Sequence, residues 1–557
     1  MIWFLLSCSS GVVTTDDVMT IRVDPPEAEI RTSPDQSNTI DFTAYAELDD
    51  GSEIVLDLVS WEISNLSAGF ISSEGTFTSV ESNGGVTEII ANHFESQGKA
   101  TLKVIYADDI LVGDLSQGLV DAFRNAQPND DENLVLVYPY DNVVVPRNLQ
   151  GLGFKWNDGS QNSSTVYRIR FRSTITDISV YTTSDEWISN TELWEMIAAS
   201  NRDGLVEVYV EAGVWDGSTL SSVRKGVSNS LVVNRLDARG SVLYWAMNTR
   251  AIMRLPVGAT EAEFFWRNPG PGQNCIGCHA LSEQADRLVV THSGANGRFS
   301  IVDIEDPETP ERVVDPNDFN TLTFKTVSPD GQYFFGTNGN QASLYNVSNG
   351  VRIKDWTFDH PVAHPDWSPD GNQILLVHVN GASRSDLEFN KGEIVQYDFD
   401  IQTLELQNGV VMKEADETFN FYYPAYSPDG DWIAYNRANN TPPADQSLRM
   451  CYAAPDAELW LMSRDGSIDI RLDNANGFEP MQNSYPRWGP LPDDDVLWLA
   501  YSSRREYPLE GPSEPQIWLV GIDPAKAKQG EDPSSAPFWL PGQVVNSDNH
   551  LPVWWSK

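Results

Sequence analysis

A short repeat in the C-terminal half of the chain constrains its fold more than any other feature. Two clear copies read HPDWSPDG at 364–371 and YPAYSPDG at 423–430, and degenerate copies lie at 324–331 and 485–490. An apolar run typical of a strand follows each copy, and Pro-Asp-Gly predicts a tight turn whose glycine takes a positive φ. The copies recur at roughly 40 to 65 residues, a period that predicts the blades of a β-propeller.

Six blades are expected. Residues 550–555 have the pattern of an inner strand with no outer strands after them, and residues 241–255 have outer strands with no inner strand before them. Pairing these two segments would close the ring and remove its free sheet edges. The repeats resemble those of TolB-type six-bladed propellers over most of residues 240–557. That resemblance implies the fold and leaves the function open, because propellers serve many functions.

Two β-sandwiches are predicted before the propeller, so the fold class is all-β. Residues 17–107 alternate with the period of half-buried strands and resemble a bacterial Ig-like domain. Residues 108–132 are predicted to be a linker with a short helix near 117–125. Residues 133–235 resemble a fibronectin type III sandwich. The propeller is assigned to residues 236–557.

The pentapeptide CIGCH at 275–279 carries the strongest chemical signal. Two thiols three residues apart, followed at once by an imidazole, are the attachment signature of a c-type haem. Cys275 and Cys278 would bond one porphyrin, and His279 would be the proximal iron ligand. A zinc site would need a fourth ligand from elsewhere, and a redox Cys-x-x-Cys pair normally lies where a strand runs into a helix. We therefore expect one covalent haem c.

The repeat register also suggests a distal haem ligand. Symmetry places the residues four positions before the repeat serine, or its equivalent, at one level around the channel mouth: Cys278, Phe324, His364, Tyr423, Tyr485 and His550. The positions of His292, His360 and His378 in the repeat return them to the same rim. The expected distal ligands are, in order, His364, His550 and His292. The competing ligand is a methionine, because thioether ligation raises the haem potential; the sequence does not rank Met253, Met412, Met450 and Met481.

The N-terminal segment suggests a lipid anchor. Cys8 follows a short apolar run at 2–6 and precedes two serines, and this segment resembles a bacterial lipobox, so residues 1–16 are expected to be a signal remnant and tether. Together with haem c, the lipobox predicts a protein anchored in the bacterial cell envelope, at the periplasmic or exterior face of the outer membrane. Cys451 is expected to be a small buried hydrophobe.

Charge limits the partners. The chain has 80 acidic and 37 basic residues, for a formal net charge of -43. Such a field repels nucleic acid and anionic lipid headgroups, so no nucleic-acid partner is expected and membrane contact is assigned to the lipid anchor alone. The expected partner is a redox protein with a basic surface.

Three functions are compatible with these features. The favoured one is electron transfer by a monohaem cytochrome whose propeller holds the haem. The second is a haem enzyme, peroxidase-like or substrate-oxidising, with an open distal site beside an acid-base residue. The third is a surface binding or assembly protein in which the haem is structural. A hydrolase is disfavoured because the sequence contains no Gly-x-Ser-x-Gly elbow and no phosphate-binding glycine loop.

Overall fold

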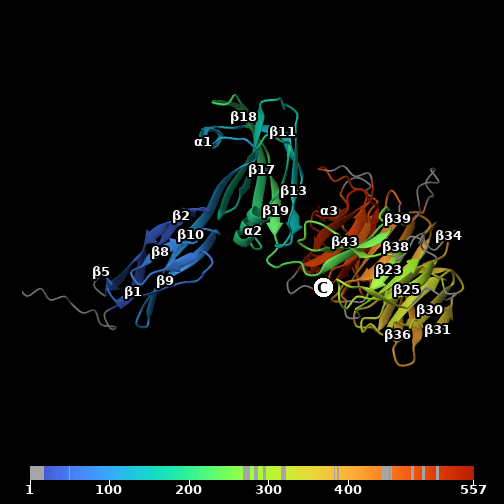
Figure 1. The fold of residues 1–557 in the computed structure, drawn as a ribbon. Coiled ribbons are helices and arrows are strands. Elements are labelled where there is room, and N and C mark those ends of the chain that lie inside the picture. The colour runs from blue at the N-terminus through green and yellow to red at the C-terminus, as the bar shows by residue number, and fades with distance from the viewer. Residues whose placement is uncertain are drawn as a thin grey trace, which may run out of the picture. The chain divides into compact units, whose positions relative to one another are not determined.

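The computed structural model of the protein describes residues 18–48, 51–267, 276–281, 286–292, 297–314, 321–381, 383–385, 388–440, 451, 454–477, 482–491, 496–509 and 514–557. The chain forms two compact units, and the second begins at residue 137 and holds everything after 231. Strands dominate both units, and the longest described helix has ten residues (Figure 1). The predicted all-β class is confirmed.

The first unit is built around one thirteen-stranded sheet whose N-terminal and C-terminal parts meet at a long strand. Strand β10 (Ser96–Leu111) pairs antiparallel with β9 (Gly85–His93) and parallel with β2 (Glu27–Thr32) and β15 (Thr176–Thr182). The sheet continues through β14 (Thr165–Arg172), β17 (Leu205–Trp215), β18 (Leu220–Val227) and β11 (Asn129–Tyr138) on one side, and through β6 (Ser60–Ile63) on the other. Two further sheets are β1 (Val18–Asp24), β4 (Thr43–Leu48) and β5 (Glu53–Val55), and β3 (Thr39–Asp41), β8 (Thr76–Ser79) and β7 (Gly69–Ile71).

The segment expected to be a linker, 108–132, is structured in three parts. It begins inside β10, contains helix α1 (Gln117–Asn125) at the expected place, and ends inside β11. The helix buries Leu119, Val120 and Phe123 against Val166 and Tyr181 of the sheet. Because these three residues lie on one side of the helix, the sheet covers its apolar stripe. The expected boundaries of the sandwiches remain a prediction.

The second unit is a ring of six sheets, drawn from green to red in Figure 1. From the innermost described strand outward, the first three are β46 (Asn549–Trp555), β20 (Ser241–Ala246), β21 (Ala251–Pro256), β22 (Glu263–Trp266); β23 (Ile276–Leu281), β24 (Arg287–His292), β25 (Gly297–Asp303), β26 (Glu311–Val314); and β28 (Phe324–Val327), β29 (Tyr333–Asn338), β30 (Gln341–Asn346), β31 (Arg352–Thr357). The others are β32 (Val362–Trp367), β33 (Gln373–Val379), β36 (Gly392–Asp400), β37 (Glu405–Lys413); β38 (Phe419–Tyr426), β39 (Trp432–Asn439), β40 (Glu458–Ser463), β41 (Asp469–Arg471); and β42 (Ser484–Trp488), β43 (Leu497–Ser503), β44 (Gln516–Ile522), β45 (Phe538–Trp539).

The inner strands close the ring. Each one contacts the next in the order β23, β28, β32, β38, β42 and β46, and β46 returns to β23. The blade that joins the two ends of the propeller is the predicted one: β46 pairs antiparallel with β20, and Trp555 lies opposite Ser241. The last strand of the chain thus completes the sheet begun by β20, which leaves no open edge at the junction.

The repeat builds the predicted turn between the first two strands of a blade. In the copy at 364–371 the Ser368 hydroxyl donates to Asp370 at 2.6 Å and accepts the backbone N–H of Gln373 at 2.9 Å. Gly371 has a φ of 78°, a backbone conformation that side chains disfavour. The same bonds recur around Ser328 and Ser427. Serine, aspartate and glycine are therefore repeated because each has a separate role in one turn.

Candidate functional site

The described part of the haem motif lies on the innermost strand of one blade. Cys278 and His279 belong to β23 and both are buried; Cys275 lies outside the described residues. The pairing of β23 with β24 breaks register between Ile276 and His279, and the Thr291 hydroxyl donates to the Cys278 carbonyl at 3.2 Å. The motif therefore enters the propeller core where the strand is irregular.

The level predicted for the channel mouth is a packed aromatic layer. The ring centroids of Phe324 and His364 are 4.3 Å apart, those of His364 and Tyr423 3.9 Å, and those of Tyr423 and Tyr485 4.2 Å. Phe324 also lies 5.9 Å from Tyr423, two blades away, and Cys278 belongs to the same apolar cluster. These five residues do share a level, but they fill the channel there and form no open rim.

His550 was placed one residue out of register in the sequence prediction. The left-handed φ values of His364, Tyr423 and Tyr485 recur in the last blade at Leu551, whose φ is 50°. A proline follows each of the four residues, and strand pairing shifts at each of these positions. Leu551 thus occupies the level that was predicted for His550. Trp554 follows Leu551 by three residues, as Trp367 follows His364, so Trp554 aligns with Trp367 and not with the repeat serine. His550 nevertheless lies 6.1 Å from Tyr485.

His279 lines a cavity of about 400 Å³ on the turn side of the aromatic layer. Both of its ring nitrogens are buried, and no side chain among the described residues hydrogen-bonds to them, although the backbones of Leu243 and Gly277 lie close enough to raise its pKa. Burial, with a smaller contribution from the Lys325 charge, lowers the pKa of His279 to about 3. The imidazole is therefore neutral near pH 7 and keeps a free lone pair, as a metal ligand requires.

Three charged side chains share this cavity, and sequence reasoning missed them. Lys325 and Arg487 bring positive charge, and Asp366 accepts the backbone N–H of Tyr426 at 2.8 Å. Burial lowers the pKa of Lys325 to about 8 and raises that of Asp366 to about 6. The available signal was their place in the repeat. Lys325 stands where the three other copies have proline, and Asp366 and Arg487 stand where the copy at 423–430 has Ala425.

The other predicted histidines differ in their bonding. His364 Nδ1 accepts the backbone N–H of Tyr423 at 3.3 Å, while its Nε2 is buried with no partner among the residues described. His292 Nε2 lies 2.6 Å from the Ser300 hydroxyl. His360 and His378 form a pair, 2.7 Å between ring nitrogens. Because Nδ1 accepts a hydrogen bond, the proton of the neutral His364 ring is on Nε2. Nε2 could bind a metal only after this proton moved to Nδ1 and the bond from Tyr423 was broken.

The remaining candidate ligands lie in outer strands or outside the described residues. Met253 lies in β21 and Met412 in β37, both outer strands, and Met450 and Met481 are outside the described residues. Within the described ranges, no three His, Cys, Asp or Glu residues group as a metal site, which disfavours a zinc site built from them. Cys451 is a buried thiol that donates to the Phe389 carbonyl at 3.3 Å, as expected of a structural cysteine.

The residues around β23 fit a covalent haem in their chemistry. A neutral imidazole without a side-chain partner is available at His279, and Nε2 of His364 would become a second ligand atom once its proton moved to Nδ1. The Cys278 side chain packs in the aromatic layer, while His279 faces the cavity beyond it. Ligation of one haem by both residues therefore requires β23 to open between them, and the strand already breaks register there.

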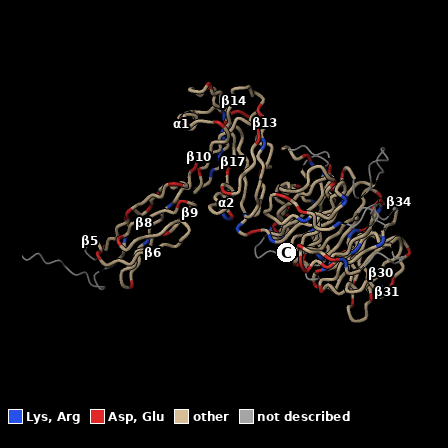
Figure 2. The backbone as a smooth tube through the Cα atoms, in the orientation of Figure 1, with Lys and Arg blue, Asp and Glu red and all other residues tan. Residues whose placement is uncertain are grey.

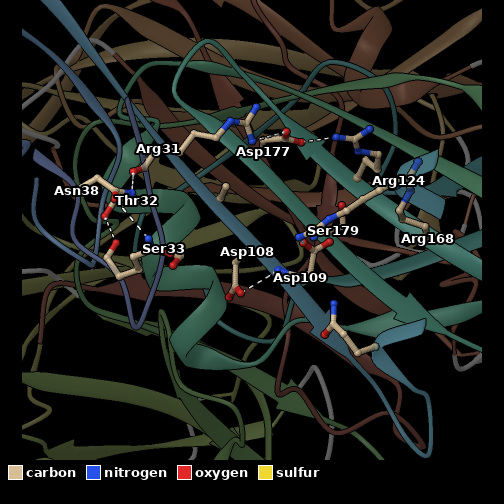
Figure 3. Close-up of a pocket in the computed structure, with 14 residues that line it drawn as sticks. Arg31, Thr32, Ser33, Asn38, Asp108, Asp109, Arg124, Arg168, Asp177 and Ser179 are labelled. Carbon is tan, nitrogen blue, oxygen red and sulfur yellow. Dashed lines mark hydrogen bonds and ion pairs between the residues drawn. The ribbon is translucent and has the colours of Figure 1, made fainter. Parts of the chain in front are cut away.

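A second cavity, of about 630 Å³, lies in the first unit (Figure 3). Its charges are matched: Asp177 pairs with Arg31 at 3.3 Å and with Arg170, and Asp109 pairs with Arg124. Because these arginines already have carboxylate partners, the cavity offers little uncompensated charge to a ligand. Cys8 lies outside the described residues. No helix in the part of the chain that the structure describes is long and apolar enough to cross a bilayer.

Comparisons with known proteins find solved structures that match the chain at low sequence identity and low TM-score. No family model matches the chain, and no curated protein matches it. The TolB protein of Agrobacterium tumefaciens is 17% identical over 56% of this chain and 97% of its own, with a TM-score of 0.33. Hydrazine synthase of Kuenenia stuttgartiensis is 13% identical over 63% of this chain and 84% of its own, with a TM-score of 0.29. A protein from Lactobacillus plantarum is 11% identical over 56% and 98%, with a TM-score of 0.32.

Proposed function

We propose that this protein is a monohaem c-type cytochrome that transfers electrons, with its haem held by Cys275, Cys278 and His279 in the propeller. The observation that carries the proposal is the buried imidazole of His279, which lines a cavity next to Cys278 in the chain and has no side-chain hydrogen-bond partner among the described residues. A bound haem would supply one-electron redox chemistry. The chain would supply the thiols, the proximal ligand and a core closed by the aromatic layer.

The distal ligand in this proposal is His364. Its Nε2 is buried without a partner within the described ranges and would bind iron once the ring proton moved to Nδ1. Its ring packs against Phe324 and Tyr423, which belong to the same apolar cluster as Cys278. Burial holds the pKa of His364 well below its usual value, so the ring stays neutral. Two imidazole ligands leave no open iron position, which suits an electron carrier better than an enzyme.

The cellular setting is proposed from the sequence. A lipid on Cys8 would tether the chain to the outer membrane of a bacterial envelope, and the sandwiches, proposed to be bacterial Ig-like and fibronectin type III modules, would act as a stalk. Acidic residues are scattered along both units rather than gathered in one patch (Figure 2). A protein of this charge would associate fastest with a redox partner that has a basic surface.

The test is an absorption spectrum of oxidised and reduced protein made in a host that matures haem c, recorded before and after carbon monoxide is added. The proposal expects a six-coordinate, low-spin spectrum that carbon monoxide does not change. His364→Phe should convert it to a spectrum that carbon monoxide shifts. The control is His378→Phe, another buried histidine of the same blade, which should leave the spectrum unchanged. A wild-type spectrum without haem would refute the proposal.

One observation favours a haem enzyme as the second candidate. The carboxyl group of Asp366 lines the same cavity as His279, and burial raises its pKa to about 6, where a general acid or base works near neutral pH. In that case the wild-type protein itself would be high-spin and would bind carbon monoxide. A haem that can be removed with no loss of partner binding would indicate the third function, a surface assembly protein.

A further inference from the structure

The cavity beside His279 has an apolar wall made by one aromatic residue from each of four blades. These residues are Trp367, Tyr426, Trp488 and Trp554. The tryptophan N–H groups are used elsewhere: Trp367 donates to the Gly371 carbonyl at 3.0 Å, and Trp488 to the Ala425 carbonyl at 3.0 Å. Trp554 donates to a backbone carbonyl at 2.8 Å. With those groups satisfied, what the indoles offer a ligand in the cavity is mainly flat apolar surface.

Positive charge is in excess in this cavity. Lys325 is buried, and its Nζ has no hydrogen-bond partner within the described ranges. Arg487 Nη1 donates to the neighbouring Pro486 carbonyl at 3.0 Å, which leaves most of its guanidinium donors for another acceptor. Asp366 is the one acidic side chain among the described residues of the wall. Two cations against one carboxylate are notable in a chain whose net charge is -43.

An unpaired buried ammonium is expensive, so such a site is best explained by a ligand that pairs with it. We propose that the cavity binds the carboxylate group of a small, flat organic molecule, with the carboxylate held by Lys325 and Arg487 and the body packed against Trp367 and Trp488. Charge-assisted bonds to a carboxylate are among the strongest available to lysine and arginine. The aromatic wall makes an inorganic anion a poorer match than an organic acid.

The carboxylate has two possible sources: a free organic acid or a propionate of a haem bound at His279. The proposal holds for either source, because the cation pair and the aromatic wall are properties of this chain with or without haem. Benzoate is the probe, and benzamide, its uncharged isostere, is the control ligand. Calorimetric titration of the full-length chain is done on the haem-loaded protein and on the Cys275→Ala/Cys278→Ala variant, which cannot attach a haem.

Saturable binding of benzoate to both proteins would assign the cavity to a free organic acid. Binding to the haem-free variant alone would assign it to a propionate. In each protein that binds benzoate, Lys325→Met and Arg487→Met should each lower the affinity for benzoate at least about tenfold. This is the loss expected for one charge-assisted bond. Lys354→Met, a lysine on the outer strand β31 of the same blade, should leave affinity unchanged.

The proposal is overturned if neither protein binds benzoate, if benzamide binds as well as benzoate, or if both cavity variants bind like the wild type. These results are independent of the electron-transfer proposal. Failure of haem attachment would appear in the absorption spectrum and would leave the titration of the haem-free chain intact. Two separate cation variants keep the test valid if one of them fails to fold.

Discussion

Lys325 is expected to destabilise the propeller when its cavity is empty. The ammonium group is buried, and the described residues provide no partner for its Nζ. Methionine has a similar length and shape, carries no charge, and fills irregular apolar space well. We therefore predict that Lys325→Met raises the stability of the second unit in the haem-free Cys275→Ala/Cys278→Ala background.

The magnitude follows from the pKa. Burial lowers the pKa of Lys325 from 10.5 to about 8, which corresponds to about 3 kcal/mol of penalty for the charged form at neutral pH. The second unit, of about 350 residues, unfolds with an entropy of about 0.7 kcal/mol/K, so the gain should raise its melting temperature by about 4 °C. Between about pH 8 and 10.5 the unfolded chain binds more protons than the folded one. Wild-type stability therefore rises with pH there, and the advantage of the variant disappears.

Scanning calorimetry at one scan rate measures this shift at pH 7 and at pH 10.5. Lys354→Met serves as the control, because this lysine lies outside the channel and forms an ion pair with Glu405. Saturating benzoate should reduce the difference between wild type and Lys325→Met, since bound carboxylate stabilises the wild-type protein more than the variant, which binds it more weakly. A lower melting temperature for Lys325→Met at pH 7 without ligand would refute this account of the cavity.

Three other changes probe the fold. Trp555→Ala removes a fully buried side chain from the blade that closes the ring and should lower the free energy of unfolding by about 3–5 kcal/mol. Phe264→Ala, at an exposed position of the same blade, should lower it by less than about 0.5 kcal/mol, and calorimetry compares the two variants. Burial lowers the pKa of His378 to about 4, so urea midpoints should be highest above pH 6.5 and fall towards pH 4, and His378→Phe should flatten this dependence. Arg168→Met leaves the buried carboxylate of Glu211 without its ion-pair partner and should lower the free energy of unfolding in urea by about 3–5 kcal/mol. The double variant Arg168→Met/Glu211→Leu should recover most of that loss.

The propeller could be predicted from the sequence because its turns depend on side chains. Ser368, Asp370 and Gly371 make a turn through bonds between near neighbours, so the same three residue types recur wherever the turn recurs. The closing blade was predictable for a related reason: each end of the propeller lacked the strands that the other end supplied. Local chemistry and strand count thus specify this half of the fold.

The interior of the channel was harder to predict because it depends on contacts between blades. Phe324 and Tyr423 meet across two blades, and nothing in their local sequence distinguishes a packed layer from an open mouth. The slip at His550 arose because the last blade has no repeat serine, and its register is set by strand pairing with β20. The continuation of the sheet from β10 into the strands of residues 129–233 likewise depends on parallel pairing with β15, a contact between distant segments.

The central claim is that Cys275 and Cys278 bind a haem covalently, and the intact mass of the denatured protein tests it most directly. Protein made in a host with haem c maturation should carry the added mass of one haem, retained in acid and organic solvent. Cys278→Ala should lose most of that mass gain, while Cys451→Ala, a change at a buried thiol outside the motif, should keep it. A wild-type chain with no added haem mass, and with both motif thiols free to alkylation, would contradict the account.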